Sequence, residues 1–511
     1  MASDGTTPAP SSRFDGARPG PATADELDVD VAIVGAGISG IGAAYHLQRD
    51  CPGKRYAILE AREAIGGTWD LFRYPGIRSD SDMFTLGYGF KPWTHPQAIA
   101  DGASIRDYVE EAAREHDIER HIRFGERLRS AEWSSEQQCW TLELERAGSG
   151  ERSQLRARFL SMCSGYYRYD RGHTPDFPGA ERFTGTVIHP QHWPEDLDYG
   201  DRRIVVIGSG ATAVTLIPEL AERAQHVVML QRSPTYMVSA PGTHPIANVL
   251  RRLLGMRIAY HVIRWLSARL QQFAYRSARK DPAGARKRLL QDVRKQLGPG
   301  FDVDRHFAPR YDPWEQRLCL VPDGDFFEAI RAGKASVVTD QIEGFTERGI
   351  RLRSGDELAA DIVVTATGLD LEVLGGVRFA VDGEPVDFAR TYTYKGMMFS
   401  GVPNLSITFG YINASWTLRA DLTAEYVCRL INHMDETGTC TCVPRLREQD
   451  RDMPERPWIE GFTPGYMTRS MHLFPRQGDR EPWLNPQSYH RDRKMLRRDP
   501  IEDGVLIFGP P

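Results

Sequence analysis

The stretch DVDVAIVGAGISGIGAAYHLQRDCPGKRYAILE at residues 28–60 decides the fold of this 511-residue chain. It begins with an apolar strand pattern, passes through a glycine-rich turn into a helical pattern, and ends in a second apolar strand. Gly35, Gly37 and Gly40 form the spacing G-x-G-x-x-G between the first strand and the helix. This order predicts a dinucleotide-binding β-α-β unit, in which backbone N–H groups at the helix start approach a pyrophosphate.

Glu60 stands at the end of the second strand of this unit. An acidic side chain about 20 residues after the glycines accepts hydrogen bonds from ribose hydroxyls. The glycine spacing alone is a weak signal, but strand, helix and acid all fall where a ribose-binding unit needs them. We therefore predict that the three glycines and Glu60 bind a nucleotide cofactor.

A second unit of the same kind follows at residues 202–232, as RRIVVIG, SGATAVTLIPELAER and HVVMLQR. Its turn carries Gly208, Gly210 and Ala213, and its second strand is followed by Arg232 instead of an acid. An arginine there pairs with a 2′-phosphate, which an acid would repel. The second unit is thus predicted to bind NADPH in preference to NADH. The alternative is that Arg232 is a solvated surface residue.

A basic helical segment separates this unit from DIVVTATG at residues 361–368, which predicts a buried parallel strand ending in a glycine turn. Residues 245–296 hold 13 Arg or Lys against Asp281 and Asp292, and apolar residues recur at helical spacing. Two interpretations are open. The segment is either a solvated lid over a substrate cleft or a surface that attaches loosely to an anionic membrane.

Composition narrows the class of protein. A net charge of −5 gives no case for nucleic-acid binding. Seven scattered cysteines are not a disulfide framework, and without a C-x-x-C motif neither a dithiol flavin reductase nor a metal site is expected. These features favour a cytoplasmic enzyme acting on small molecules, and no apolar run reaches the 18 residues of a membrane span.

Residues 1–27 are rich in Ala, Pro, Gly, Ser and Thr and predict a disordered tail.

The segment FTGTVIHPQHWP at residues 183–194 matches the pattern F-x-G-x-x-x-H-x-x-x-W-P at five fixed positions. This resembles the fingerprint of the Baeyer–Villiger monooxygenases, which are class B flavin monooxygenases. Trp193 favours that branch over neighbouring enzymes that oxygenate nitrogen and sulfur. From their place just before the second unit, we interpret His189 and Trp193 as residues that couple the domains without touching substrate.

Further segments, among them RYPGIRSDSD, LQRSPTY, PWEQRLCLVPDGD, NASWTLRADL and FTPGY, resemble the ethionamide-activating subfamily, and the likeness runs from Val29 to about Phe508. The resemblance implies FAD and NADPH as cofactors and dioxygen as co-substrate. It implies a monooxygenase that converts ketones to esters and oxygenates sulfides or thioamides. The alternatives are an N- or S-oxygenating enzyme without useful ketone activity, or an uncoupled NADPH oxidase.

The resemblance also assigns site residues. Asp80 and Arg317 correspond to the family's active-site aspartate and catalytic arginine, while Thr68 and Trp69 lie in the segment that covers the flavin. Gln316 stands where ketone-oxidising relatives often have lysine, which puts the substrate range in doubt. The alternatives are a turn-capping role for Asp80 and a structural ion pair for Arg317. Trp416 either donates a hydrogen bond to the nicotinamide ribose or fills the core under the flavin.

The predicted fold is therefore α/β, with two Rossmann-like dinucleotide-binding domains, one for FAD and one for NADP, and a helical insertion. The predicted boundaries are residues 28–170 and 375–511 for the FAD-binding domain, 180–240 and 328–374 for the NADP-binding domain, and 241–327 for the insertion.

Overall fold

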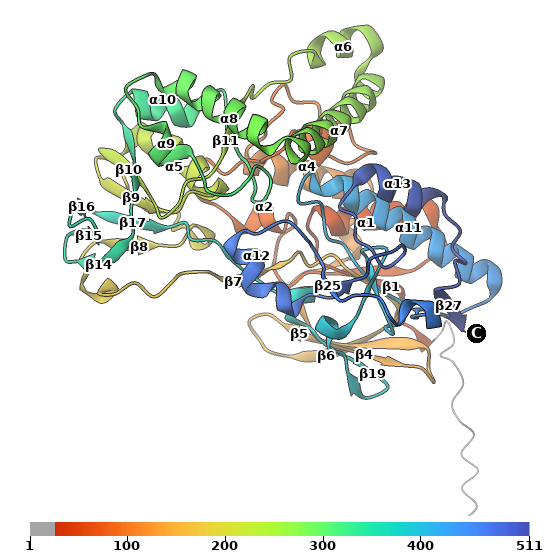
Figure 1. The fold of residues 1–511 in the computed structure, drawn as a ribbon. Helices are drawn as coiled ribbons and strands as arrows, with labels where there is room; N and C mark the ends of the chain where they lie inside the picture. Colours follow the sequence, from red (N-terminus) through yellow and green to blue (C-terminus); the bar gives the residue numbers. More distant parts are fainter. Residues whose placement is uncertain (1–25, 510–511) are drawn as a thin grey trace, which may run out of the picture.

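The computed structural model describes residues 26–509, so the predicted disordered tail lies almost wholly outside the described residues. Leu27, the last residue of that predicted tail, is buried against Cys139. Figure 1 shows two β-sheet regions side by side, with a helical segment above them. This arrangement confirms the predicted α/β fold with a helical insertion.

The first sheet is built around the stretch that opens the chain. β1 (Val29–Val34) pairs in parallel with β2 (Tyr56–Leu59), and α1 (Ile38–Asp50) connects them. Burying each apolar side chain of these strands contributes roughly 1.5–3 kcal/mol. The sheet has nine strands. The others are β3 (Ile122–Arg123), β4 (Glu126–Ser134), β5 (Cys139–Arg146), β6 (Arg152–Met162), β19 (Arg378–Val381), β20 (Glu384–Pro385) and β23 (Leu405–Ile407).

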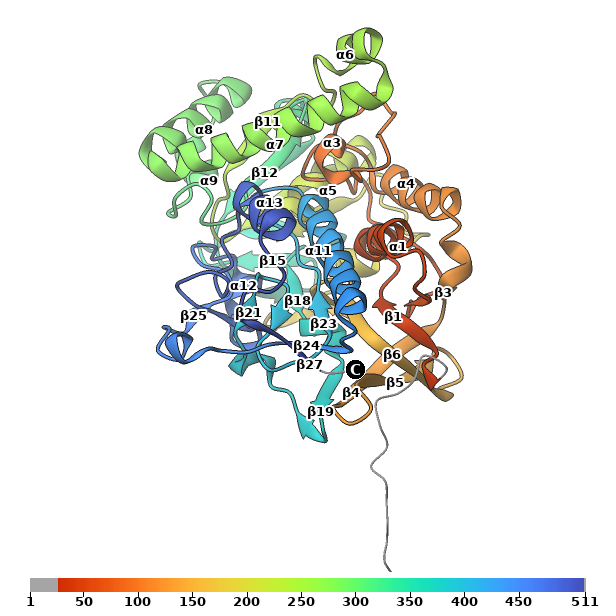
Figure 2. The same ribbon diagram turned by 90° about the vertical axis from the view of Figure 1, so that its right-hand side faces the viewer.

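The C-terminal part of the chain returns to this sheet. β23 pairs in parallel with β6, and α11 (Trp416–Thr437) then packs along α1, as Figure 2 shows. The segment after residue 403 thus forms a strand, a loop and a helix that belong to the first region. The other helices of this region are α2 (Thr68–Leu71), α3 (Met83–Leu86), α4 (Gly102–Glu115), α12 (Gly465–Ser470) and α13 (Tyr489–Arg498).

The second sheet is fully parallel in the order β13-β10-β9-β17-β8. β9 (Arg203–Ile207), α5 (Ala211–Arg223) and β10 (His226–Gln231) form the second predicted unit. β17 (Ile362–Thr365) is the predicted buried strand, and Gly368 just beyond it has φ +107°. The other elements here are β8 (Thr186–Ile188), β13 (Ala335–Thr339), β14 (Ile342–Thr346), β15 (Gly349–Leu352), β16 (Glu357–Ala359) and α10 (Asp325–Arg331).

The basic segment is helical, as predicted. It forms α6 (Ala247–Leu254), α7 (Met256–Lys280) and α8 (Pro282–Leu297), and α9 (Val303–Phe307) follows. α7 packs on α3 of the first region, whereas α8 and α9 join the apolar core of the second. The insertion therefore contacts both nucleotide-binding regions (Figures 1 and 2).

Two antiparallel strands join the regions: β7 (Tyr167–Gly172) pairs with β18 (Leu369–Leu371). The His189 ring lies against this junction. Its Nε2–H faces the Gly368 carbonyl oxygen at 3.3 Å, and its Nδ1 accepts the N–H of Gln191 at 3.2 Å. A Cβ at Gly172 would lie 1.9 Å from the ring, so this contact requires glycine. His189 thus occupies the domain junction, as interpreted.

Short strand pairs complete the described structure. They are β11 (Met237–Ala240) with β12 (Cys319–Pro322), β21 (Thr393–Tyr394) with β22 (Met398–Phe399), β24 (Thr441–Pro444) with β27 (Leu506–Gly509), and β25 (Arg456–Pro457) with β26 (Arg476–Gln477).

Candidate active site

The turn between β1 and α1 is closed by backbone on several sides. Gly35 has φ +103°, and a Cβ there would lie 2.6 Å from the carbonyl oxygen of Cys163. A Cβ at Gly40 would lie 1.8 Å from the carbonyl oxygen of Gly35. Gly37 caps α1 and lies against Gly67. Only glycine therefore allows this turn and the close approach of the helix to the strand.

Glu60 is fixed in a buried position at the end of β2. One carboxylate oxygen accepts the Ala36 N–H at 2.7 Å, and the other accepts the Arg62 N–H at 2.9 Å. Burial raises the pKa of Glu60 above its ordinary value, and the two N–H groups oppose that shift. The carboxylate is thus oriented beside the glycine turn, where it could accept hydrogen bonds from a ribose.

The turn between β9 and α5 has the same backbone path but a more open surface. Gly208 has φ +134°, and a Cβ there would lie 2.2 Å from the Ala366 carbonyl oxygen. Gly210 caps α5, and a Cβ there would meet no atom within 4 Å. Ala213 is fully buried and packs α5 against the sheet.

Arg232 lies directly after β10, where the sequence places it, and its side chain is exposed. No carboxylate among residues 26–509 pairs with it. A free guanidinium at this strand end could bind a 2′-phosphate bidentately.

One cavity of about 790 Å³ connects the start of α1 with the start of α5. Its volume falls in the range of ligand-binding cavities. The predicted residues that line it are Gly35, Gly37, Glu60, Thr68, Trp69, Asp80, Arg317 and Trp416. The predicted residues outside its lining are Gly40, Gly208, Gly210, Ala213 and Arg232.

Three residues that line this cavity each carry a side-chain atom that lacks a hydrogen-bond partner in the described part of the chain. They are buried side-chain atoms: Arg62 Nη1, Arg129 Nε and Ser164 Oγ. Leaving a buried donor unpaired costs about 1–3 kcal/mol, so such atoms point to a ligand with hydrogen-bond acceptors. Phosphate and ribose oxygens of a dinucleotide fit these donors. The residues present are therefore compatible with FAD.

Arg317 and Asp80 form an ion pair on the wall of the cavity, although 237 residues separate them in the chain. About a third of each side chain is exposed, on the side of the cavity that they line. The charge of Asp80 raises the pKa of Arg317 above its ordinary value, against the opposing effect of burial. The guanidinium is therefore a permanent positive charge in the cavity.

The loop that carries Asp80 lies between the two nucleotide-binding units. Arg78 on this loop forms an ion pair with Asp325 at the start of α10. A Cβ at Gly76 would lie 2.9 Å from the Thr215 carbonyl oxygen of α5. Both contacts tie the position of Asp80 to the second unit.

Aromatic side chains form another part of the wall. The Trp416 ring stacks on Tyr166 at 5.4 Å between centroids, and its indole N–H donates to the Ser39 hydroxyl at 2.7 Å. Thr68 accepts a hydrogen bond from the Tyr167 hydroxyl at 2.5 Å. In this structure the Trp416 N–H is thus directed to α1, not to open space.

Tyr166 and the unpaired donors Arg62, Arg129 and Ser164 are cavity residues that sequence reasoning did not identify. Burial raises the pKa of Tyr166, and nearby Arg317 opposes that shift. Tyr166 follows the strand β6, so its place at the carboxyl end of a sheet strand is the signal that could have found it.

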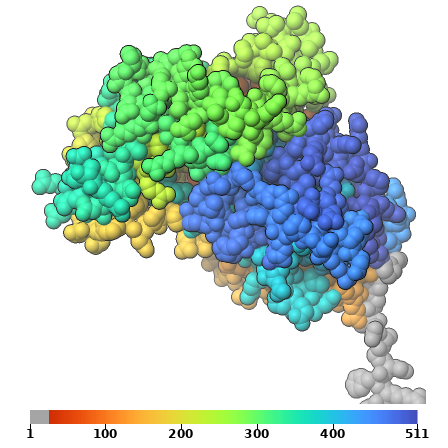
Figure 3. Space-filling view, viewed as in Figure 1, coloured from red at the N-terminus to blue at the C-terminus, as the bar shows by residue number. Residues whose placement is uncertain are grey.

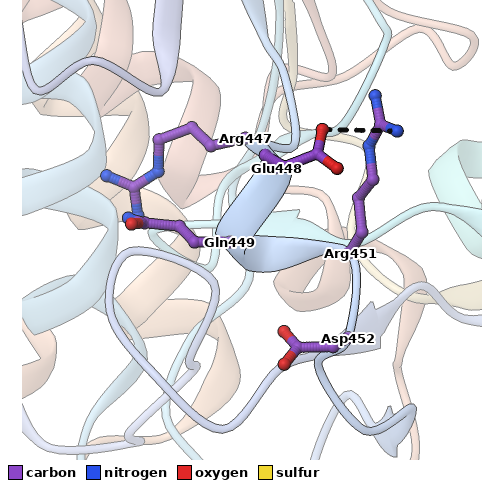
Figure 4. A pocket seen from close by; sticks show the side chains of 5 residues that line it. All are labelled: Arg447, Glu448, Gln449, Arg451 and Asp452. Carbon is purple, nitrogen blue, oxygen red and sulfur yellow. Dashed lines mark ion pairs between the residues drawn. The ribbon is translucent and has the colours of Figure 1, made fainter.

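A second hollow, shown in Figure 4, has a different character. Arg447, Glu448, Gln449, Arg451 and Asp452 line it, and Glu448 pairs with Arg451 at 3.5 Å. Arg447 also pairs with the buried Asp450 at 2.7 Å, which caps the same short turn. The Arg447–Asp450 and Glu448–Arg451 pairs lie within one turn, and Asp452 pairs with Arg480 at 3.8 Å, so we assign no chemistry to this hollow.

Other kinds of site find no support in the described residues. All seven cysteines are free thiols. Residues 26–509 contain no group of three or more His, Cys, Asp or Glu side chains that could hold a metal ion. In the same range, no helix is long and apolar enough to cross a membrane.

Comparison with known proteins identifies the family. The flavin-binding monooxygenase-like family matches residues 88–278, and an NAD(P)-binding Rossmann-like domain matches residues 33–98. The FAD-containing monooxygenase EthA of Mycobacterium tuberculosis is 56% identical over 482 residues, which cover 94% of this chain and 98% of that protein.

Solved structures share the fold. A steroid monooxygenase bound to NADP has a TM-score of 0.75 at 24% identity, over 94% of this chain and 100% of that one. OTEMO in complex with FAD and NADP has a TM-score of 0.72 at 21% identity, with the same coverage. These comparisons confirm the family and the two cofactors expected from the sequence. The chain belongs to the class B flavin monooxygenases, which are FAD- and NADPH-dependent enzymes.

Proposed function

We propose that this enzyme inserts one oxygen atom from dioxygen into ketones to give esters, and that it also oxygenates sulfides or thioamides. The observation that carries the proposal is the Arg317–Asp80 pair on the wall of one cavity that extends from the first glycine turn to the start of α5. A fixed positive charge in the cavity between the two nucleotide-binding units supports oxygen transfer as the reaction.

In this proposal the first turn binds FAD and the second turn binds NADPH. FAD, reduced by NADPH, supplies the electrons and the activation of dioxygen. The residues proposed to hold FAD are Gly35, Gly37, Gly40, Glu60, Thr68 and Trp69, and those proposed for NADPH are Gly208, Gly210, Ala213 and Arg232.

Arg317 is proposed as the catalytic residue that stabilises negative charge during oxygen transfer. When a nucleophilic oxygen attacks a ketone, negative charge develops on the carbonyl oxygen. A preorganised donor in a site of low dielectric stabilises that charge far more than water does. Because its pKa is raised by Asp80, Arg317 stays protonated throughout.

Asp80 is proposed to position Arg317. An ion pair limits the rotamers of a long arginine side chain, and catalytic groups need such support to keep a productive geometry. The loop contacts of Arg78 and Gly76 with the second unit hold Asp80 in turn. Trp416 and Tyr166 add an aromatic wall beside the same pair.

Oxygen transfer to sulfur is favoured by a separate observation. Gln316 precedes Arg317 here, where ketone-oxidising relatives often carry lysine. The resemblance to the ethionamide-activating subfamily covers the same segment. A thioamide or sulfide sulfur is itself the nucleophile, so its oxygenation needs less stabilisation of an oxyanion.

Product analysis under dioxygen enriched in oxygen-18 tests the proposal. The FAD-loaded enzyme would be supplied with NADPH and either a linear ketone such as 2-decanone or a sulfide such as methyl phenyl sulfide. A labelled ester from the ketone supports the proposal. Labelled sulfoxide without ester reduces the function to heteroatom oxygenation, and hydrogen peroxide alone shows an uncoupled oxidase.

A further inference from the structure

Exposed apolar side chains are concentrated in one part of the described structure. Ten of the thirteen large apolar side chains that are exposed lie between Ile246 and Phe273, on α6, on α7 and at the residue just before α6. Leu253 is 74% exposed and Phe273 is 70% exposed. We call this surface, residues 246–273, the apolar ridge. Figure 3 shows α6 projecting beyond the rest of the surface in light green.

The ridge, together with the end of α7, is also cationic. Residues 246–280 contain eight Arg or Lys and no Asp or Glu, although the whole chain has a net charge of −5. The eight are Arg251, Arg252, Arg257, Arg264, Arg269, Arg276, Arg279 and Lys280. All but Arg251 and Arg264 are exposed, and the Arg269 guanidinium lies 4.2 Å from the centre of the exposed Trp265 ring. Apolar and basic side chains thus share one surface.

The inner face of α7 is firmly packed, so the exposed side chains do not belong to a loose helix. Arg264 is buried, donates to the carbonyl oxygens of Phe84, Thr85 and Gly87, and pairs with Asp421 at 3.0 Å. Such a network fixes which face of α7 points outward. The ridge is therefore a permanent outer surface, and a lid that folds inward would have to break these bonds.

We propose that the apolar ridge docks the enzyme on the surface of an anionic lipid bilayer. A helix with apolar side chains flanked by Lys and Arg lies in the lipid interface and is attracted by acidic headgroups. A second copy of the chain is less complementary to this surface than an anionic bilayer. A two-fold contact would place the same cationic surface against itself, without an acidic side chain in residues 246–280 to offset the charge.

The ridge is linked to the catalytic loops. Gln271 of α7 donates to the Asp82 carboxylate at 2.8 Å, two residues beyond Asp80. Tyr275 of α7 contacts the Trp314 ring at 5.5 Å, three residues before Arg317. Docking would therefore hold the cavity near a membrane, where apolar substrates concentrate. This last step rests on the proposed function, whereas docking itself does not.

Vesicle flotation of the full-length FAD-loaded enzyme tests the proposal. We expect binding at low salt to vesicles of equal parts phosphatidylglycerol and phosphatidylcholine, and little binding to phosphatidylcholine alone. Leu253→Ser and Phe273→Ser should each lower the partition coefficient about tenfold, because each removes one inserted apolar side chain. Arg252→Gln should lower it about fivefold. The matched control is Ile507→Ser, an exposed apolar side chain outside the ridge, which should change nothing.

Two results would overturn the proposal. One is that anionic vesicles fail to bind the wild-type enzyme, or bind the ridge variants equally well, while all variants keep full FAD content. The other is that sedimentation without lipid shows a dimer that Leu253→Ser dissociates, which would assign the ridge to a second copy. Flotation needs no substrate, so it does not depend on the reaction catalysed.

Discussion

The two nucleotide-binding turns share a backbone path but differ in how far the protein encloses them. At the first, Gly37 lies against Gly67, and the oriented carboxylate of Glu60 is buried. At the second, Gly210 faces open space, and Arg232 is exposed. One sequence motif can therefore build either an enclosed or an accessible site, depending on the segments packed over it.

This difference matches what the two cofactors must do. A flavin that stays bound through many turnovers benefits from an enclosed site, whereas a nicotinamide cofactor must enter and leave. We infer that enclosure by residues 66–67 retains FAD, while the open second turn permits exchange of NADP. Substitutions at equivalent positions of the two turns test this inference.

The largest expected effect is that of Gly40→Ala. The added Cβ would lie 1.8 Å from the Gly35 carbonyl oxygen, a backbone atom, so the turn or the helix would have to shift. Overpacking of this kind costs roughly 1–3 kcal/mol or more, so the purified variant should have a lower Tm and little bound FAD. The matched change, Gly210→Ala, adds a Cβ in open space and should keep both Tm and FAD while raising the KM for NADPH. Equal loss of FAD in both variants would contradict the comparison.

A smaller effect is expected for Arg232→Ala. Loss of a charge-assisted pair with the 2′-phosphate should raise the KM for NADPH about 10- to 100-fold and leave NADH oxidation almost unchanged. The control is Arg202→Ala, an exposed arginine at the opposite end of this sheet, which should affect neither coenzyme. Steady-state kinetics with both coenzymes distinguishes the outcomes. An equal loss for NADPH and NADH would show that Arg232 does not bind the 2′-phosphate.

The smallest expected effect concerns pH. Burial raises the pKa of Glu60, so in the apoprotein this carboxyl takes up a proton at a higher pH than usual. Its contribution to apoprotein stability is therefore greatest at acidic pH and is lost as pH rises through the raised pKa. Ribose hydroxyls bind the ionised form, so FAD affinity should fall several-fold as pH decreases through the same range. Fluorescence titration of apoenzyme with FAD measures this.

Glu60→Gln provides the control for the pH effect. Glutamine keeps the size and one acceptor oxygen but does not titrate, so it should bind FAD more weakly with no dependence on pH in that range. If the variant retains the wild-type pH dependence, another group is responsible.

The local parts of the fold were predictable from the sequence. Strand, glycine turn and helix follow one another within residues 28–60, and their patterns depend only on near neighbours. Glu60 and Arg232 could be predicted for the same reason, because each ends a strand at a known distance from its glycines. The helices of the insertion followed from apolar periodicity.

Long-range contacts could not be predicted in this way. Asp80 and Arg317 come from loops 237 residues apart, and only family resemblance suggested that they act together. The stacking of Tyr166 on Trp416 leaves no periodic signal in the sequence. The basic residues of the insertion did not reveal that Arg264 is turned inward against Asp421. Such pairings depend on how elements pack, which local patterns do not encode.

In the proposed reaction Arg317 serves oxygen transfer and not hydride transfer. Two measurements on Arg317→Ala test this role: the stopped-flow rate of flavin reduction by NADPH, and the product yield per NADPH consumed. Hydride transfer creates no comparable oxyanion, so reduction should persist while product formation falls about 100- to 1000-fold and hydrogen peroxide accumulates. Arg317→Lys should rescue little, because it keeps the charge but loses the planar guanidinium. Product formation by Arg317→Ala at near wild-type yield per NADPH would contradict the claim and leave Arg317 with a structural role only.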